Sequence, residues 1–509
     1  MTASRYLIRT GVAAAAALLA GLVLLGGTGA AAAAPYAPPN CPTVTYHSDP
    51  SLNAQAVCEN LGVTTSGTQP GTYLFLTPGG QNGDGAGIYT DTGSLVWWQG
   101  GLGPKDHDLS VQYFHGQPYL AVWSGRGASG GAYGQGSVLL YNQHYQLAGR
   151  LNISSAYGAE QIDLHEFQIT PEGDALTGSY TYDWRFVNGH WEWVLGYLVE
   201  KWALVQNANG IQIGPLLFAW NAINDVPISD SHLPSPARHA AVYDYFHGNG
   251  ITEAPDGDLL VSSRNTWGIY EINDRRGTPG FDHIYWQVGA VHDSKLAEPW
   301  CYQHDIAALG HGVYSLYDDG GFGPGCMPGS TQHPARGLIF SVNTSHRPVQ
   351  VHLIRAFTHN PAIYTGYTGS VQVLSNGDTL IDWANVPEIT EYSSTGQVKM
   401  DLSMSYWSYR GFRFPWDGQP TQPVAVAAQK SGSGTTVWVS WNGTTETTAW
   451  QVLGGPDASH LAPVGAPVAK SGFETTIPLS GQYNTIEVKA LNSRGQVIGS
   501  SDPVSPSVR

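Results

Sequence analysis

Three short stretches of the sequence combine a histidine with acidic or amide side chains. They are Asp-Leu-His-Glu-Phe at 163–167, Phe-His-Gly-Asn at 246–249 and Gln-His-Asp at 303–305. A neutral imidazole can attack an electrophile, ligate a metal or exchange a proton near neutral pH, so each histidine is a candidate catalytic residue. A β-rich run around a glycine follows each stretch, and these glycines are Gly173, Gly257 and Gly312.

The three histidines, His165, His247 and His304, therefore occupy the same place in a repeated unit. A side chain that recurs at one place in a repeat points in the same direction in every copy. In a closed array of such units, the three imidazoles are predicted to converge on one axis. His107 precedes Gly116 in the corresponding place of an earlier unit, which makes it a candidate for the same site.

Arg264 follows His247 within Val-Ser-Ser-Arg-Asn at 261–265, and a hairpin would return it toward the same end of the unit. Charged groups are rarely buried without a partner, so an arginine that points into a channel suggests an anionic ligand. Its planar fork of N–H donors suits the oxygens of a tetrahedral anion.

Two kinds of chemistry use such a cluster. The imidazoles could ligate a metal, with Asp163, Glu166 or Asp305 completing the shell. Alternatively, the cluster could bind a tetrahedral anion, with one histidine as the nucleophile of sulfuryl or phosphoryl transfer. Arg264 favours the second interpretation, because a cation beside a metal would be repelled. We therefore predict no metal and no cofactor.

The elements that must position these residues are strands. Alternating apolar segments broken by Gly, Asn and Asp dominate the chain, and six strand–turn–strand elements recur. They lie at 88–97, 138–151, 216–220, 268–286, 337–353 and 389–402. Each element follows a strand pair centred on a glycine, so one repeated unit contains four strands. This order predicts an all-β chain with a six-bladed β-propeller over residues 70–414. A pair of β-sandwiches would not explain the repetition.

A second unit is predicted after a linker at 415–423. Residues 424–509 are rich in Thr, Ser, Val and Ala and contain alternating strands, with Trp438 and Trp441 early and Tyr483 late. This spacing resembles a fibronectin type III β-sandwich. We expect no catalysis from it, and at most weak contact with a cell surface or polysaccharide.

The N-terminus is typical of an export signal over residues 1–34. Arg5 and Arg9 precede an apolar stretch at 12–25, and a run of small residues ends near Ala34, where we expect cleavage. The apolar stretch is too short for a membrane span. The mature protein is therefore predicted to be secreted, with no membrane association after signal removal.

Four cysteines in an exported chain suggest two disulfides. Three pairings are formally possible, and we favour the local one, Cys41 with Cys58 and Cys301 with Cys326. The first would staple an N-terminal segment at 35–69, and the second would brace the loop that carries His304.

The composition excludes some partners. The net charge of −16 disfavours nucleic acid and anionic membranes, since lysine and arginine would be needed to neutralise phosphates. Charged residues make up only 12%, against 63 glycines and 17 tryptophans, which is typical of a turn-rich β protein packed by aromatic side chains.

Taken together, the motifs resemble those of the arylsulfotransferases, most closely the secreted branch of actinomycetes and fungi. The matching stretches are 163–167, 245–250, 259–266, 285–289, 302–305 and 369–378. The resemblance implies a six-bladed propeller that moves a sulfuryl group from an aryl sulfate to a phenol without a nucleotide donor. Small aryl sulfates and phenols are thus the predicted partners.

The resemblance also implies roles for single residues. His304 would be the nucleophile that forms a transient sulfohistidine, while His165, His247 and Arg264 would hold the sulfate oxygens. Asn249 would assist within the His-x-Asn motif. Asn249, His107 and Ser370 are the substrate-binding candidates. Phenols have a pKa near 10 and leave with modest acid help, which His165 or His247 could give.

Departures from the family pattern affect substrate fit more than fold. They are Gly248 and Gly250 beside Asn249, and the loop at 290–295. Aromatic residues near the motifs could sandwich an aryl ring, although core packing is the commoner task for such side chains: Tyr243, Tyr245, Trp267 and Trp300.

Two other functions fit the same residues. One is a propeller that binds anionic aryl or glycan ligands without catalysis, with the C-terminal unit serving adhesion. The other is a metal-dependent propeller hydrolase or lyase that uses the same histidines.

Overall fold

The computed structural model describes residues 36–508, apart from 43, 61–62, 80–84, 103–104, 128–132, 154–160, 236–241, 290–298 and 322–332. The expected export signal lies outside the described residues. Those residues form an all-β fold with two short helical elements, α1 (Ala222–Asp225) and η1 (Ile228–Asp230). Within the part of the chain described, neither element has the length or apolar character needed to cross a bilayer.

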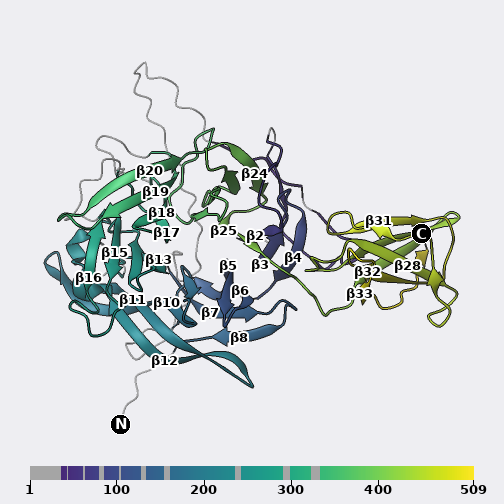
Figure 1. Cartoon of the computed structure of the whole chain (residues 1–509), viewed down its shortest axis with the longest axis horizontal. Helices are drawn as coiled ribbons and strands as arrows, with labels where there is room; N and C mark the ends of the chain where they lie inside the picture. The colour runs from purple at the N-terminus through teal and green to yellow at the C-terminus, as the bar shows by residue number, and fades with distance from the viewer. Residues whose placement is uncertain are drawn as a thin grey trace, which may run out of the picture. The chain divides into compact units, whose positions relative to one another are not determined.

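Two sheets of four antiparallel strands run in simple chain order (Figure 1). The first contains β13 (Gly248–Glu253), β14 (Leu259–Ser263), β15 (Gly268–Ile272) and β16 (Ile284–Val288). The second contains β17 (His304–Gly310), β18 (Val313–Asp318), β19 (Arg336–Asn343) and β20 (Gln350–Phe357). The predicted strand–turn–strand elements at 268–286 and 337–353 correspond to the outer strand pair of each sheet.

An eight-stranded sheet joins two further groups of four. One is β5 (Lys105–Phe114), β6 (Gln117–Gly127), β7 (Gly134–Tyr141) and β8 (Leu147–Leu151). The other is β9 (Phe167–Ile169), β10 (Asp174–Val187), β11 (His190–Asn207) and β12 (Gly210–Asn221). The two groups meet at one parallel contact, where Ile211 of β12 pairs with Gly149 of β8.

The last group in chain order is β21 (Ser370–Val373), β22 (Thr379–Asp382), β23 (Glu388–Tyr392) and β24 (Val398–Met404), with β1 (Val57–Glu59) added at its outer edge. The remaining group unites distant parts of the chain. In it β25 (Ser408–Pro415) pairs with β2 (Thr72–Pro78), which is followed by β3 (Gly85–Tyr89) and β4 (Leu95–Gly100). A late strand thus completes the earliest sheet.

The first strands of these groups form a closed series. Strand β5 contacts β9, β9 contacts β13, β13 contacts β17, β17 contacts β21, β21 contacts β25, and β25 returns to β5. Figure 1 shows the groups side by side around the centre that these strands surround. Residues at the start of each strand are therefore brought toward one axis.

Inner strands of these groups are buried on both faces, because each sheet packs against its neighbours, whereas outer strands such as β20 are partly exposed. All five residues of β15 are buried, for example, and Ile269 packs in one cluster with Leu316 and Phe340 of the next sheet. The glycines noted in the sequence form the tight turns between strands. Gly173, Gly257 and Gly312 have positive φ values of 91°, 89° and 72°, a conformation that glycine adopts without a Cβ penalty.

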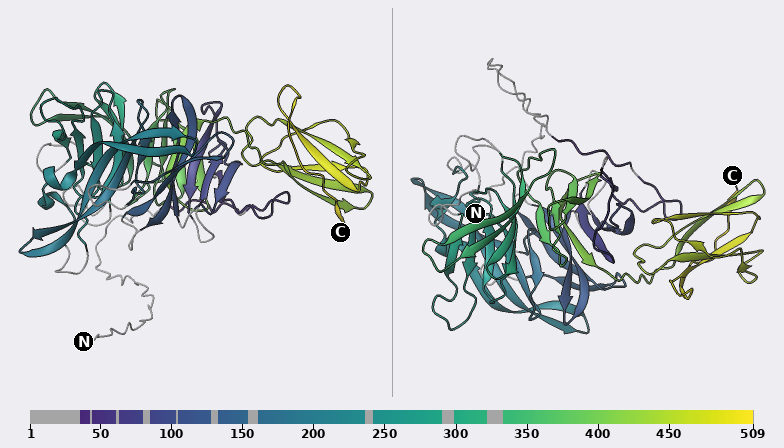
Figure 2. Two further views of the ribbon diagram at one scale, coloured as in Figure 1. Left: turned by 90° about the horizontal axis from the view of Figure 1, so that it is seen from below. Right: turned by 45° about the horizontal axis from the view of Figure 1, so that its top comes forward.

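The C-terminal strands form two further sheets, coloured yellow-green in Figure 2. One contains β26 (Ala425–Ser431), β27 (Gly434–Ser440), β31 (Thr475–Leu479) and β34 (Ser507–Val508). The other contains β28 (Ala449–Gly455), β29 (Ala462–Pro463), β30 (Val468–Ala469), β32 (Thr485–Leu491) and β33 (Val497–Ser500). The fully buried Trp450 lies in their shared core and donates to Thr475 Oγ1 at 3.0 Å.

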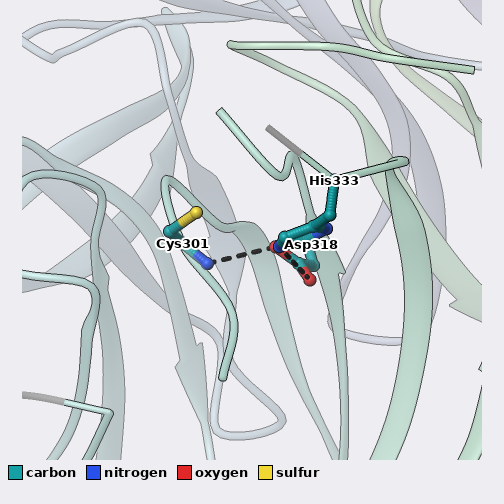
Figure 3. Close-up of side chains that lie close together, drawn as sticks. All are labelled: Cys301, Asp318 and His333. Carbon is teal, nitrogen blue, oxygen red and sulfur yellow. Dashed lines mark hydrogen bonds and ion pairs between the residues drawn. The ribbon is translucent and has the colours of Figure 1, made fainter. Parts of the chain in front are cut away.

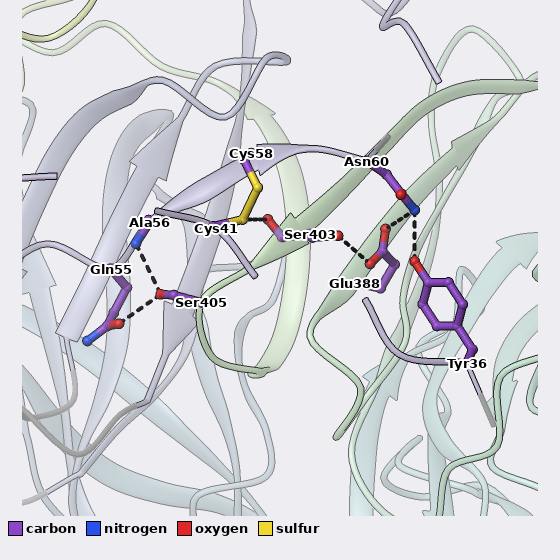
Figure 4. Close-up of a disulfide and its surroundings, with 9 residues drawn as sticks. All are labelled: Tyr36, Cys41, Gln55, Ala56, Cys58, Asn60, Glu388, Ser403 and Ser405. Atoms are coloured by element: carbon purple, nitrogen blue, oxygen red, sulfur yellow. Dashed lines mark hydrogen bonds between the residues drawn. A yellow bond between two sulfur atoms is a disulfide. The ribbon is translucent and has the colours of Figure 1, made fainter. Parts of the chain in front are cut away.

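The N-terminal segment is fastened to the β21–β24 sheet (Figure 4). Cys41 and Cys58 form the expected disulfide, and Cys58 lies in β1, beside β24. Just beyond this strand, Asn60 Nδ2 donates to Glu388 Oε1 at 3.0 Å and to Tyr36 Oη at 2.8 Å. Of the second expected pair, Cys301 is disulfide-bonded, while Cys326 lies outside the described residues.

Replacing both Cys41 and Cys58 with serine is expected to lower the free energy of unfolding by about 3 kcal/mol. The disulfide closes a 17-residue separation, and its loss returns that loop's freedom to the unfolded chain. Urea unfolding of the variant and the parent protein measures the difference. An unchanged midpoint and slope of the unfolding curve would show that the disulfide does not contribute to stability and that β1 stays paired without it.

Candidate functional site

The structure brings the three histidines of the sequence motifs together. His165 immediately precedes Glu166 and β9, His247 precedes β13, and His304 opens β17. The ring centroids of His165 and His247 lie 4.9 Å apart. Both rings are close enough to His304 for their charges to lower its pKa.

A β-bulge positions His304. In a regular strand, consecutive side chains point to opposite faces, but the register shifts between His304 and Ala307, and Asp305 has a φ of 55°. Both His304 and Asp305 are consequently buried, at 2% and 7% exposure. The same device recurs in β5, where the register shifts after His107 and Asp108 has a φ of 58°.

Each of the three histidines is oriented by a carboxylate at Nδ1. His165 contacts Asp163 Oδ2 at 2.5 Å, and His304 contacts Asp319 Oδ2 at 2.7 Å. His247 contacts Asp244 Oδ2 at 2.5 Å. A carboxylate on one ring nitrogen fixes the ring and directs the other nitrogen, Nε2, away from it.

The tautomer of His304 follows from a second contact. The backbone N–H of Thr368 donates to His304 Nε2 at 3.2 Å, so Nε2 carries a lone pair and the proton resides on Nδ1, donated to Asp319. Burial lowers the pKa of His304 well below its usual value, and the positive charge of Arg264 lowers it further. His304 is thus a neutral imidazole that donates from Nδ1 to Asp319 and accepts at Nε2 from the Thr368 N–H.

Arg264 supplies the fixed positive charge of this cluster. Its guanidinium lies 4.7 Å from the ring centroid of Tyr302, while Nη1 donates to Asn265 Oδ1 at 2.9 Å and Nη2 to the Gly366 carbonyl at 2.8 Å. Burial lowers the pKa of His247 as well, and Arg264 adds to the shift, although Asp244 opposes it. Arg264 therefore favours neutral histidines and an anionic ligand.

A second arginine, Arg410 of β25, was not anticipated from the sequence. It is 1% exposed and donates from Nη1 to Glu166 Oε2 at 2.8 Å and from Nη2 to the Asn249 carbonyl at 2.7 Å. Asp108 and Asp305 lie 3.5 and 3.6 Å from the same Nη1. One guanidinium thus joins carboxylates from three different sheet groups.

The signal for this arginine was present in the histidine motifs. In three of the units an acid directly follows the histidine, at His107-Asp108, His165-Glu166 and His304-Asp305. Burial raises the pKa of Asp108, Glu166 and Asp305, and Arg410 opposes the rise in each case. Three acids at equivalent places on one axis require a buried cation.

The other candidate residues lie around this cluster in different ways. His107 lies between Trp123 and Tyr409, at ring distances of 5.7 and 5.4 Å, and burial lowers its pKa to about 3. Asn249 is fully buried and donates to the Gln303 carbonyl at 2.6 Å, next to His304. Ser370 Oγ donates to the Gly411 carbonyl at 3.0 Å, so its hydroxyl is engaged with β25.

The aromatic candidates are engaged in packing. Tyr243 Oη donates to the Leu233 carbonyl, Trp300 Nε1 donates to the Trp267 carbonyl, and Tyr245 is fully buried. Trp267 stacks on His232 at 3.5 Å. The rings that contact site residues are instead Tyr302, under Arg264, and Tyr409, whose ring lies 5.8 Å from that of His165.

The carboxylates considered as metal ligands already have protein partners. Asp163 orients His165, and both Glu166 and Asp305 lie beside Arg410. A separate group, Cys301, Asp318 and His333, lies close together in Figure 3. Asp318 accepts two hydrogen bonds from Arg336, at 2.6 and 3.0 Å, and Cys301 is disulfide-bonded and offers no thiolate.

Comparison with known families settles the affiliation. The model of the arylsulfotransferase (ASST) family matches residues 110–405, more than half of the chain, from β5 to β24. The chain belongs to the arylsulfotransferase family. The matched range of this arylsulfotransferase includes His165, His247, Arg264 and His304, while Arg410 lies just beyond it.

A comparison with curated proteins finds no match. Among solved structures, a protein of unknown function from Bacteroides caccae is 14% identical over 67% of this arylsulfotransferase and 98% of its own chain, with a TM-score of 0.38. A streptogramin B lyase is 13% identical over 74% and 83%, with a TM-score of 0.28. Virginiamycin B lyase from Staphylococcus aureus is 10% identical over 82% and 96%, also at 0.28. Likeness at this level bears on neither substrate nor mechanism.

Replacing Arg410 with glutamine is expected to destabilise this arylsulfotransferase by about 3–5 kcal/mol, because it leaves buried carboxylates without their cation. The pKa values of these carboxyls are raised in the folded state, so their ionised forms disfavour folding, and the loss grows as pH rises. Urea unfolding at about pH 5 and about pH 8 tests both parts of the expectation.

Arg185→Gln is the matched control. The side chains of Arg185 and of its partner Asp183 are 43% and 25% exposed, so its loss is expected to cost less than about 1 kcal/mol. Equal costs for the two variants, or a cost for Arg410→Gln that falls as pH rises, would contradict the assignment.

Proposed function

We propose that the protein transfers a sulfuryl group from an aryl sulfate to a phenol through a sulfohistidine at His304, in two half-reactions. The observation that carries this proposal is the state of His304. It is a buried neutral imidazole whose Nε2 accepts a hydrogen bond from the Thr368 N–H, close to the charge of Arg264, and whose Nδ1–H donates to Asp319. The family membership supports the same activity.

In the first half-reaction, Nε2 of His304 attacks the sulfur while the bond from sulfur to the aryl oxygen breaks. The electron pair of that bond leaves with the phenoxide, and the ring acquires a positive charge. Asp319 stabilises this charge through the Nδ1–H hydrogen bond of 2.7 Å. Because a phenol has a pKa near 10, the departing oxygen needs little acid assistance, which His165 or His247 gives from Nε2 as an imidazolium, a form that the negative charge of the bound aryl sulfate favours.

In the second half-reaction, an acceptor phenol takes the place of the first product. Its oxygen attacks the sulfur, the bond from sulfur to Nε2 breaks, and the electron pair returns to His304. The phenolic proton goes to the base that assisted the first departure. The net result is a new aryl sulfate and an unchanged enzyme, with no nucleotide donor, metal or cofactor.

The sulfuryl oxygens require donors that are in place before the reaction. Arg264 is held by Tyr302, Asn265 and the Gly366 carbonyl, so its guanidinium does not need to reorganise. The Thr368 N–H donates to His304 Nε2 and is therefore next to any sulfur bound there. When the Nε2 lone pair forms the bond to sulfur, this N–H can donate to a sulfuryl oxygen instead. His165 and His247 complete the set.

Noncatalytic binding of an anionic aryl or glycan ligand would use the same positive charge of Arg264, but it does not require a carboxylate at Nδ1 of each histidine. The metal-dependent alternative needs free carboxylates near the imidazoles, and Asp163, Glu166 and Asp305 have the partners described above. Sulfuryl transfer accounts for more of the geometry than either alternative.

The surrounding architecture is part of the proposal. The closed series of first strands supports six blades over residues 70–414, with the histidines at one end of the central channel. The two sheets within residues 424–508 support a fibronectin type III-like module. The Cys41–Cys58 disulfide suits an oxidising compartment and hence a secreted enzyme.

His304→Gln is expected to reduce release of 4-nitrophenol from 4-nitrophenyl sulfate, in the presence of phenol, by at least about a thousandfold, because it removes the nucleophile. His352→Gln is the matched control, since His352 is exposed on β20, remote from the axis, and should retain full activity. Rapid quenching at alkaline pH followed by mass spectrometry should locate the sulfuryl group on residue 304. Full activity of His304→Gln would refute the proposed nucleophile.

The pH dependence of the first half-reaction provides a separate test. Because burial lowers the pKa of His304, the ring stays neutral as pH falls through about 6.5, the usual value for histidine. The rate of 4-nitrophenol release in a single turnover should therefore show no acid limb near that value. An acid limb centred there, in protein that circular dichroism shows to be folded, would mean that His304 titrates as an exposed histidine.

A further inference from the structure

The hairpin of β10 and β11 extends beyond the histidine end of its neighbours. These are the longest strands among the described residues, with 14 and 18 residues, and both are labelled in Figure 1. Thr177 of β10 pairs with Phe167, the first residue of β9, and Gly178 accepts from the Asp163 N–H at 2.9 Å. The part of the hairpin from about 180 to 195 therefore projects past the level of His165.

One face of this projection is aromatic. Tyr180, Tyr182, Trp184 and Phe186 alternate along β10 and so share a face, while Trp193 and Trp191 of β11 lie opposite Trp184 and Phe186. Tyr180 is buried at 7% exposure, but the others are 43–62% exposed. We call the exposed group the aromatic face; it consists of Tyr182, Trp184, Phe186, Trp191 and Trp193.

The rings of the aromatic face are arranged against one another. The centroids of Trp184 and Trp193 lie 5.0 Å apart, and those of Phe186 and Trp191 lie 5.8 Å apart. Trp184 and Trp191 are nearly parallel, with an interplanar angle of 9° at 6.3 Å. Large aromatic side chains held in water in this way forgo the stabilisation that burial would give, which points to a ligand.

The opposite face of the hairpin holds this arrangement in place. Val187 and Val194 are buried in the core beside Tyr245, and His190 Nε2 pairs with Glu192 at 2.9 Å. The polar side chains Asp183 and Arg185 also lie on that opposite face, 3.2 Å from each other. The hairpin therefore keeps its polar groups on one side and its aromatic rings on the other.

The aromatic face continues into the candidate active site. Tyr180 Oη donates to the carbonyl of Gly248, the residue after His247, at 3.4 Å. The ring of Tyr133 lies 4.9 Å from that of Tyr180, and its hydroxyl shares a 2.5 Å hydrogen bond with that of Tyr182. A row of rings thus leads from the histidines along β10 to solvent, and Tyr180 and Trp184 lie about 13 Å apart along the strand.

We propose that the aromatic face binds the distal rings of phenolic acceptors that contain several linked aromatic rings, while their reactive hydroxyl lies at His304. This rests on the proposed sulfuryl transfer and specifies its acceptor class. A glycan would also stack on tryptophan, but its hydroxyls need polar side chains beside the rings, and those described on this hairpin lie on the other face. The occupant is therefore apolar, flat and extended.

The test compares phenol, 4-phenylphenol and 4-(4-phenylphenyl)phenol as acceptors, with 4-nitrophenyl sulfate as the donor. The double variant Trp184→Ala/Trp193→Ala is expected to raise the KM for the three-ring acceptor about tenfold, because each aromatic contact contributes modestly beyond area burial. The KM for phenol and all kcat values should stay within about twofold of the parent protein. Tyr285→Ala is the matched control, because Tyr285 is 49% exposed but lies on β16.

Binding without turnover separates this proposal from the proposed function. Calorimetric titration of His304→Gln with the three-ring phenol should detect an affinity that is lost when Trp184 and Trp193 are also replaced. Equal binding with and without the tryptophans would overturn the proposed role of the aromatic face. Affinity for a soluble oligosaccharide instead of the phenol would overturn it as well. A dimer in sedimentation that dissociates in the double variant would assign the face to a second copy of the chain. Absence of transfer in the parent protein, by contrast, would remove only the proposed function.

Discussion

A buried guanidinium holds the centre of this molecule together. Arg410 comes from the strand that closes the ring, and its partners Asp108, Glu166 and Asp305 come from three other sheet groups. Buried ion pairs add little net stability compared with apolar packing, yet removing one partner is costly. The main effect of the network is therefore positional, because the four strands can meet only in an arrangement that satisfies this charge.

The histidine end depends on that arrangement. Asp305 is adjacent to His304 in the bulge and Glu166 is adjacent to His165, so groups that hold Arg410 also set the backbone from which the imidazoles project. The carboxylates then divide into two sets. Those following the histidines bind Arg410, whereas Asp163, Asp244 and Asp319 orient rings. The carboxylates that follow the histidines take up the charge of Arg410, and burial keeps His304 neutral, so the charge of Arg264 is left to attract an anion.

Much of this architecture could be predicted because it is local. The glycine turns and the strand–turn–strand elements depend on neighbouring residues, and a repeat carries His165, His247 and His304 to one axis without knowledge of their contacts. Ring closure by β25 could not be predicted in this way, because its pairing with β2 joins residues more than 300 positions apart, such as Thr77 and Ser408. Asp319 was also missed, since it follows His304 by 15 residues and no motif marks it.

The Arg410 network also divides the central channel. A cavity of about 250 Å³ is lined by Asp108, Glu166 and Asp305 and continues along the same strands to Gln112 and Phe412, on the side away from the histidines. The salt-bridged side chains form a floor between that cavity and the imidazoles. Arg410 and its carboxylates therefore close this side of the histidines. In the proposed sulfuryl transfer, donor and acceptor would then both have to reach His304 from the opposite side and share one route, which agrees with two successive half-reactions.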